Sequence, residues 1–212
     1  MDIGKSFTYL FDDENWVTKI LIGGLFVLLS SIVIGIPFML GYMVETVKNV
    51  IDGNPRPLPD WADLGAKFTK GLMLFLILLI YSLPIIFVSC LSWMGAIVAG
   101  ESEAIGAFVV CMNCLSGLWG LLVAIVTPAA TIRYAITGEF MSGFRFGEIF
   151  NFIANNLANY IIAFLLSVLA SFIGGFGVIL CGVGVLFTGF WASLVEAHLF
   201  GQVYRASETQ II

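Results

Sequence analysis

The sequence predicts an all-α membrane protein in which six transmembrane helices form three hairpins, each preceded by a short interfacial amphipathic helix. Two observations predict this class. First, 60% of the 212 residues are hydrophobic and only 11% are charged, whereas soluble domains average about 45–50% and about 25%. Second, long uncharged stretches separate the Lys and Arg residues, and each stretch can cross the roughly 30 Å of membrane hydrocarbon.

The first apolar stretch, residues 16–52, is too long for one crossing, because a single helix of this length would extend about 54 Å. Proline disfavours helix both at its own position and at the residue before it, so Gly35-Ile36-Pro37 is the expected break. We therefore expect spans at 17–34 and 36–52. The rival interpretation makes 17–45 one span and gives five crossings in total.

The second apolar stretch is predicted to form spans at 71–99 and 104–132. Neither contains a charged residue, and the acidic sequence Gly100-Glu101-Ser102-Glu103 lies between them. Pro84 and Pro128 lie inside these spans, where proline can kink a helix.

The third apolar stretch, residues 149–195, is also uncharged and is interrupted by Gly174-Gly175-Phe176-Gly177. This pattern predicts spans at 157–174 and 178–203. Glycine commonly ends helices, so Gly53 and Gly138 are expected to end the second helix of the first and second hairpins.

With six spans, all basic residues fall on one face of the membrane. The positive-inside rule makes that face cytoplasmic, which predicts a protein of the cytoplasmic membrane with both termini in the cytoplasm. Five spans would place Lys5 and Lys19 opposite the other seven. The nine basic residues are Lys5, Lys19, Lys48, Arg56, Lys67, Lys70, Arg133, Arg145 and Arg205.

Aromatic and acidic residues alternate before each hairpin at helical spacing, which indicates short helices in the headgroup plane. Ordinary loops with anchoring aromatic residues are the alternative. The whole chain, residues 1–212, is predicted to be one integral membrane domain with pseudo-repeats at about 5–53, 58–138 and 143–206. The expected interfacial anchors are Trp16, Trp61, Phe144 and Phe146.

Four ionisable residues are predicted to lie inside the membrane: Glu45, Arg133, Glu196 and His198. Charges in hydrocarbon are costly and usually pair within the helix bundle. We expect a polar cluster in which Arg133 bridges Glu45 and Glu196. The cluster is interpreted either as a packing clamp or as a proton- or ion-linked site.

The sequence predicts no catalytic residues, no cofactor and no metal site. It has a single His and lacks the H-E-x-x-H, G-x-S-x-G and Walker A motifs. Cys111 and Cys114 form a C-x-x-C pair in an apolar run; small apolar helix residues and a redox or metal pair are the two interpretations. The expected partners are the lipid bilayer and either another protein or a second copy of the chain. Nucleic acid is excluded because no basic cluster is present.

Several stretches, in this order, resemble the prokaryotic multi-pass membrane proteins of domain-of-unknown-function family 4013. The resemblance implies a multi-pass membrane protein of bacteria or archaea, and it implies no known activity and no catalytic residues. The stretches are Trp16 with residues 19–24, Gly41-Tyr42, Leu58-Pro59-Asp60-Trp61, Gly71, Tyr81, Pro128, Arg133-Tyr134-Ala135, Phe144 with Phe146, and residues 197–205.

The missing motifs and the amphipathic segments on one face favour a non-enzymatic scaffold, assembly factor or accessory subunit. The alternative is a small-molecule or ion carrier with a buried charged cluster, since interrupted spans and buried charges occur in transporters. A membrane enzyme is the third and weakest interpretation.

Overall fold

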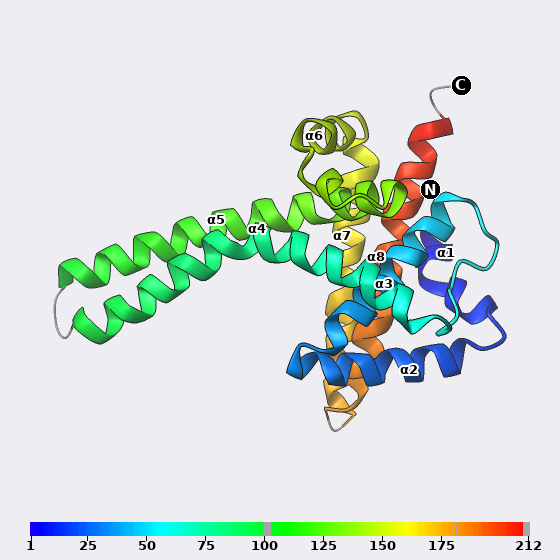
Figure 1. Cartoon of the computed structure of the whole chain (residues 1–212), viewed down its shortest axis with the longest axis horizontal. Coiled ribbons are helices and arrows are strands. Elements are labelled where there is room, and N and C mark those ends of the chain that lie inside the picture. Colours follow the sequence, from blue (N-terminus) through cyan, green and yellow to red (C-terminus); the bar gives the residue numbers. More distant parts are fainter. Residues whose placement is uncertain (100–102, 181, 210–212) are drawn as a thin grey trace.

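The chain, described here by a computed structural model that covers residues 1–99, 103–180 and 182–209, is helical throughout its regular structure, and this part contains no strand (Figure 1). In chain order the elements are α1 (Ile3–Thr8), η1 (Tyr9–Asp12), α2 (Trp16–Leu29), η2 (Ser30–Ile32), α3 (Gly35–Ile51), α4 (Leu64–Ala99), α5 (Glu103–Thr137), η3 (Phe140–Phe144), α6 (Phe146–Asn155), α7 (Leu157–Gly175), η4 (Phe176–Ile179) and α8 (Gly184–Thr209).

The predicted break in the first apolar stretch is confirmed. Helix α2 passes into η2, and Val33 then adopts a left-handed conformation with φ of 69° before α3 begins. The turn exposes Ile32, Val33 and Ile34. Helix α2, at 14 residues, is only about 21 Å long, which is shorter than the hydrocarbon core.

Helices α4 and α5 form a long antiparallel arm that projects from the rest of the molecule (Figure 1). They contain 36 and 35 residues, which extends both helices beyond the predicted spans, and Pro84 and Pro128 lie inside them. Gly138 follows α5 with a φ of 68°, as Gly53 follows α3 with a φ of 76°, so both predicted helix stops are confirmed. The predicted acidic loop lies, apart from Glu103, outside the described residues.

The remaining helices form a body beside the base of the arm. Helix α7 pairs with α8, and α8 also packs against α2 and α3. Figure 1 shows α7 and α8 running across the direction of the arm, with α1 close to the second half of α8.

Two of the three predicted amphipathic helices are present, and one is not. Helix α1 with η1 precedes α2, and η3 with α6 precedes α7. The segment before α4, residues 54–63, has no helix. Pro55, Pro57 and Pro59 explain this result, because each lacks a backbone N–H and disfavours helix in the residue before it.

Helices α3 and α4 pack with their backbones almost in contact. A Cβ atom at Gly71 would lie 1.6 Å from the Pro37 carbonyl oxygen, and one at Gly41 would lie 1.9 Å from the Lys67 carbonyl oxygen. Small residues permit such close approach in membrane helices. This contact joins the base of the arm to the body.

Three helical segments in the described chain are long and apolar enough to cross a membrane: Leu64–Gly95, Gly106–Thr137 and Leu157–Ile179. A fourth is counted if Ile3–Asp12 and Trp16–Ile32, which meet at 100°, form one bent span. The structure is therefore that of an all-helical protein with three to four candidate spans.

Candidate functional site

The four ionisable residues predicted to cluster lie instead in four separate environments. The expected bridge from Arg133 to Glu45 and Glu196 is not formed, because both Arg133 and Glu45 have nearer partners of opposite charge. Arg133, on α5, pairs with Glu148 in the first turn of α6. The Arg133–Glu148 pair fastens the segment before α7 to the base of the arm.

Glu45 binds two lysines on α4. Its carboxylate oxygens lie 2.5 Å from Lys67 Nζ and 2.8 Å from Lys70 Nζ. Lys67 is buried, and its Nζ also lies 6.0 Å from the centre of the Tyr42 ring. This pairing lies beside the Gly41 and Gly71 contact and reinforces the packing of α3 against α4.

His198 joins α8 to the amino-terminal helix. Its Nδ1 lies 3.0 Å from Ser6 Oγ and 3.0 Å from Gln202 Nε2, and its ring stacks on Tyr9 at a centroid distance of 4.2 Å. His198 thus holds α1 in place.

Glu196 differs from the other three. None of the described residues forms an ion pair or hydrogen bond with its carboxylate. It lines a cavity of about 220 Å³ between α3, α4, α5 and α8, together with Leu40, Met43, Val47, Leu74, Leu78, Thr127, Pro128, Thr131, Ala197 and Phe200. Unlike Glu45 and His198, which also line recesses, Glu196 faces its cavity without a hydrogen-bond or ion-pair partner among the described residues.

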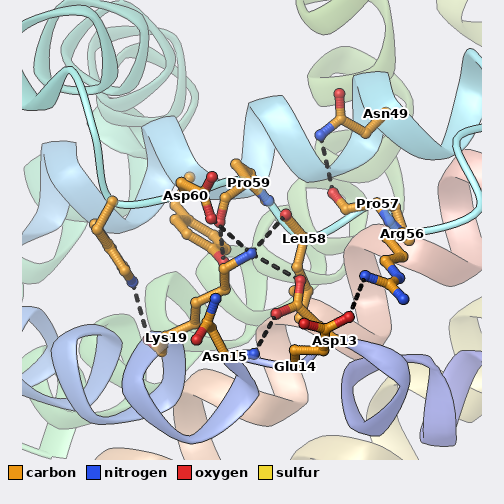
Figure 2. A network of polar contacts seen from close by, with 12 residues as sticks. Asp13, Glu14, Asn15, Lys19, Asn49, Arg56, Pro57, Leu58, Pro59 and Asp60 are labelled. Carbon is orange, nitrogen blue, oxygen red and sulfur yellow. Dashed lines mark hydrogen bonds and ion pairs between the residues drawn. The ribbon is translucent and has the colours of Figure 1, made fainter.

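The strongest polar network in the body involves residues that the sequence did not single out as a site (Figure 2). Lys19 is only 7% exposed. Its Nζ lies 2.7 Å from Asp13 Oδ2 and 2.9 Å from Asp60 Oδ1, and it donates to the Leu58 carbonyl oxygen at 3.1 Å. The network joins the start of α2 to the irregular segment before α4.

Aromatic side chains adjoin this network. The Trp61 indole N–H donates to the Lys19 carbonyl oxygen at 2.9 Å, and the Tyr42 hydroxyl donates to the Pro59 carbonyl oxygen at 2.8 Å. Trp61 stacks on Tyr42 and Phe26, with centroid distances of 4.4 and 4.8 Å. The three prolines prevent helix in this segment, and side-chain donors satisfy the free carbonyls of Pro57, Leu58 and Pro59.

The hydrogen bonds of Asp13 change its acidity. Burial acts to raise the pKa of this carboxyl group. The hydrogen bond from Lys19 and the one from the Asn15 backbone N–H outweigh burial, so the pKa lies below its ordinary value. Asp13 is therefore held as a carboxylate opposite the Lys19 ammonium.

The predicted anchors make specific contacts within the protein. Trp16 lies edge-on to Phe11 at 5.0 Å, and Phe144 and Phe146 pack on Tyr81 at 5.7 and 5.9 Å. Trp61 belongs to the aromatic group around Lys19. Phe146 remains 46% exposed.

The described residues contain no group of three or more His, Cys, Asp or Glu side chains arranged to hold a metal ion. Cys111 and Cys114 are free thiols on the exposed surface of α5. A polar recess of about 410 Å³ lies beside His198, and its lining includes Asp2, Lys5 and Arg205.

Tertiary structure was needed to find the Lys19 network, although the sequence held a signal for it. In the sequence, Lys19 stood out only as one of the nine basic residues, near the start of the first predicted span. One acid that binds it, Asp13, directly precedes α2, and the other, Asp60, lies in the proline-rich segment before α4. The cavity at Glu196 had no such signal, because it depends on four helices meeting.

The family described as "Protein of unknown function (DUF4013)" matches residues 24–183 of the chain. The match covers most of the sequence, so the chain belongs to this family. No curated protein and no solved structure matches the chain.

Proposed function

We propose that this member of the DUF4013 family is a non-enzymatic protein of the cytoplasmic membrane that serves as a scaffold, assembly factor or accessory subunit. The observation that carries the proposal is the uncovered α4–α5 arm. Trp93, Phe87 and Leu118 are 75%, 65% and 65% exposed. Such an extended apolar surface requires lipid or a partner protein to cover it.

The placement of the charged residues supports this role over that of a carrier. Lys19, Glu45 and Arg133 each bind groups that fasten one segment of the chain to the next. Ion pairs committed to packing in this way stabilise one conformation. A carrier would instead be expected to keep such groups available to its cargo.

The proposal places three hairpins in the membrane with both termini in the cytoplasm. The turns at Ile32–Ile34 and Val178–Leu180 are apolar and exposed, whereas the charged networks lie near the other ends of these helices. Helix pairs with an apolar turn at one end and charged residues at the other are expected when a hairpin inserts from one face of the membrane and its basic end stays in the cytoplasm. The short α2 and α3 would require local thinning of the bilayer.

Single cysteines introduced into a cysteine-free variant test the topology. We expect Asn54→Cys and Ser207→Cys to react with a membrane-impermeant maleimide only after the cytoplasmic face is opened. Ser31→Cys at the first turn should react from outside, or resist the reagent if the turn lies in hydrocarbon. Opposite accessibility of the Asn54 and Ser207 positions would overturn the shared cytoplasmic face.

Site-specific photocrosslinking tests the scaffold role. A photoreactive residue at Trp93 or Leu118, in the native membrane, should yield a protein adduct of one defined mass. The same group at Phe172, which is 66% exposed on α7, is the matched control outside the arm. Adducts with lipid alone at all three positions would contradict the role proposed for the arm.

A further inference from the structure

The cavity beside Glu196 has the features of a ligand site, and it is independent of the scaffold role. Its walls come from four helices, and most of the lining is apolar. Glu196 is the one ionisable side chain among its lining residues. A carboxylate in such surroundings is unfavourable unless something compensates its charge.

No compensation comes from the described part of the chain. Glu196 forms no ion pair with any of the described residues, so its charge is left without compensation in the cavity. Lys67 and Lys70 bind Glu45, and Arg133 binds Glu148, although the Arg133 Nε has no hydrogen-bond partner among the described residues.

Tyr160, on α7, gives no hydrogen bond to Glu196. Its hydroxyl donates instead to the Ile125 carbonyl oxygen at 2.6 Å. Among the described residues, the Glu196 carboxylate therefore has neither a hydrogen-bond donor nor a cation as partner.

The α5 wall of the cavity adds oxygen acceptors. Thr127 and Thr131 line it one helical turn apart, and Thr131 Oγ1 donates to the Thr127 carbonyl oxygen at 2.9 Å. The Thr131 oxygen keeps its lone pairs for a further donor. Pro128, between them, has no N–H to give to the Ala124 carbonyl.

We propose that this cavity binds a primary ammonium group attached to a short apolar chain, with Glu196 as the counter-ion. The ammonium supplies the missing charge and up to three donors. Leu40, Leu78 and Phe200 pack against the apolar alkyl group of the ligand. Since a cavity of roughly 150 Å³ can hold benzene, one of about 220 Å³ accepts a six-carbon amine. A bare metal cation fits less well, because the walls offer few oxygen ligands.

The ammonium group can come from a free amine or from the headgroup of an amino lipid. Both sources share the chemistry that Glu196 recognises. The full-length protein in nanodiscs of phosphatidylcholine alone isolates the first source, because this lipid has no primary amine. Nanodiscs that also contain phosphatidylethanolamine introduce the second.

The test is thermal unfolding of the full-length protein with increasing hexylamine, compared with 1-hexanol as a neutral probe of equal length. In phosphatidylcholine, hexylamine should raise the Tm saturably, and 1-hexanol should raise it much less. If phosphatidylethanolamine occupies the site, it should raise the Tm by itself and weaken the response to hexylamine. An unchanged hexylamine response assigns the site to the free amine.

Three variants assign the effect to the cavity. Glu196→Gln removes the charge at nearly constant volume, so without amine it should be at least as stable as the parent, and it should bind hexylamine at least tenfold more weakly. Leu78→Phe narrows the cavity and should also weaken binding, although Glu196 is kept. Glu14→Gln makes the same charge change on an exposed side chain and should bind like the parent.

The proposal is overturned if hexylamine and 1-hexanol stabilise the protein equally, which would indicate an apolar pocket. It is also overturned if Glu196→Gln keeps the hexylamine response, or if hexylamine has no effect on the parent protein in phosphatidylcholine nanodiscs. None of these outcomes depends on the crosslinking of the arm, so the scaffold role and the ligand site can fail separately.

Discussion

The α4–α5 arm and the body of this protein are stabilised in different ways. Only 6% of the most apolar stretch of α5 is buried inside the protein, against 28% for α7. In the body, Tyr9, Tyr42 and Phe190 are almost completely buried, and the buried Lys19 ammonium has three oxygen partners.

The comparison shows that hydrophobicity alone does not identify a core in a membrane protein. In the membrane location proposed above, side chains of the arm can remain apolar and exposed, because lipid tails are as favourable an environment for them as a protein core. The body must satisfy irregular backbone and several charges, and it does so with specific partners. Substitutions should therefore have large effects in the body and small ones in the arm.

The largest effect is expected from Lys19→Met. The change removes the ammonium but keeps a stem of similar shape, which leaves the buried Asp13 carboxylate without its main partner. We expect a loss of about 3–5 kcal/mol in the free energy of unfolding, as for other broken buried ion pairs.

Denaturant unfolding in mixed micelles measures this loss. The control is Lys5→Met, which breaks a half-exposed pair with Asp12 and should cost at most about 1 kcal/mol. Equal losses in the two variants would show that burial of the Lys19 network does not strengthen it.

A matched pair of isoleucines on α4 compares the two regions within one helix. Ile77 is fully buried at the base of the arm, whereas Ile97 is 79% exposed near its tip. Ile77→Ala should lower the free energy of unfolding by about 3 kcal/mol because it leaves a cavity. Ile97→Ala should change it by less than about 0.5 kcal/mol.

The same unfolding measurement applies to both isoleucine variants in lipid nanodiscs. If Ile97→Ala lowered the free energy of unfolding as much as Ile77→Ala, a second protein chain would have to cover the tip of the arm even after purification.

A pair of glycines tests the packing of helices in the two regions. Gly71→Ala forces a methyl group against the Pro37 carbonyl oxygen and should destabilise the protein by about 1–3 kcal/mol. Gly117, on α5, has no neighbour near its Cβ position, so Gly117→Ala should stabilise by about 0.5–1 kcal/mol through helix propensity.

Melting temperatures of these two glycine variants should move in opposite directions. Destabilisation by Gly117→Ala would indicate a close helix contact on the arm that forms only between copies or with a partner.

The smallest effect is expected on acidification. The pKa of Asp13 is lower in the folded protein than its ordinary value, so its contribution to stability is complete above about pH 4 and is lost as the pH falls through the folded pKa. Asp13→Asn should therefore lose less stability than the parent below pH 4. An identical acid dependence of Tm in the parent and the variant would contradict a role for this carboxylate.

Much of the local structure could be predicted from the sequence. The break before Pro37, the stops at Gly53 and Gly138, and the helices that precede the first and third hairpins follow from residues close together in the chain. The prediction of a helix before α4 was wrong. It rested on the alternation of aromatic and acidic residues at Asp60, Trp61 and Asp63, and it neglected the three nearby prolines.

The site was harder to predict than the helices. Arg133, Glu45 and Glu196 were expected to meet because they lie at similar depths, but depth does not determine which face of a helix a residue occupies. Arg133 pairs instead with Glu148 on α6, and Glu45 pairs with Lys67 and Lys70 in the first two turns of α4.

The sequence by itself determined that this is an all-helical chain of apolar segments, because hydropathy, glycine and proline act over a few residues. Tertiary structure alone decided which charges pair, that α4 and α5 extend as an arm, and that Glu196 faces a cavity. These features depend on helix crossings between residues far apart in the chain, and backbone contacts such as that between Gly71 and Pro37 set them.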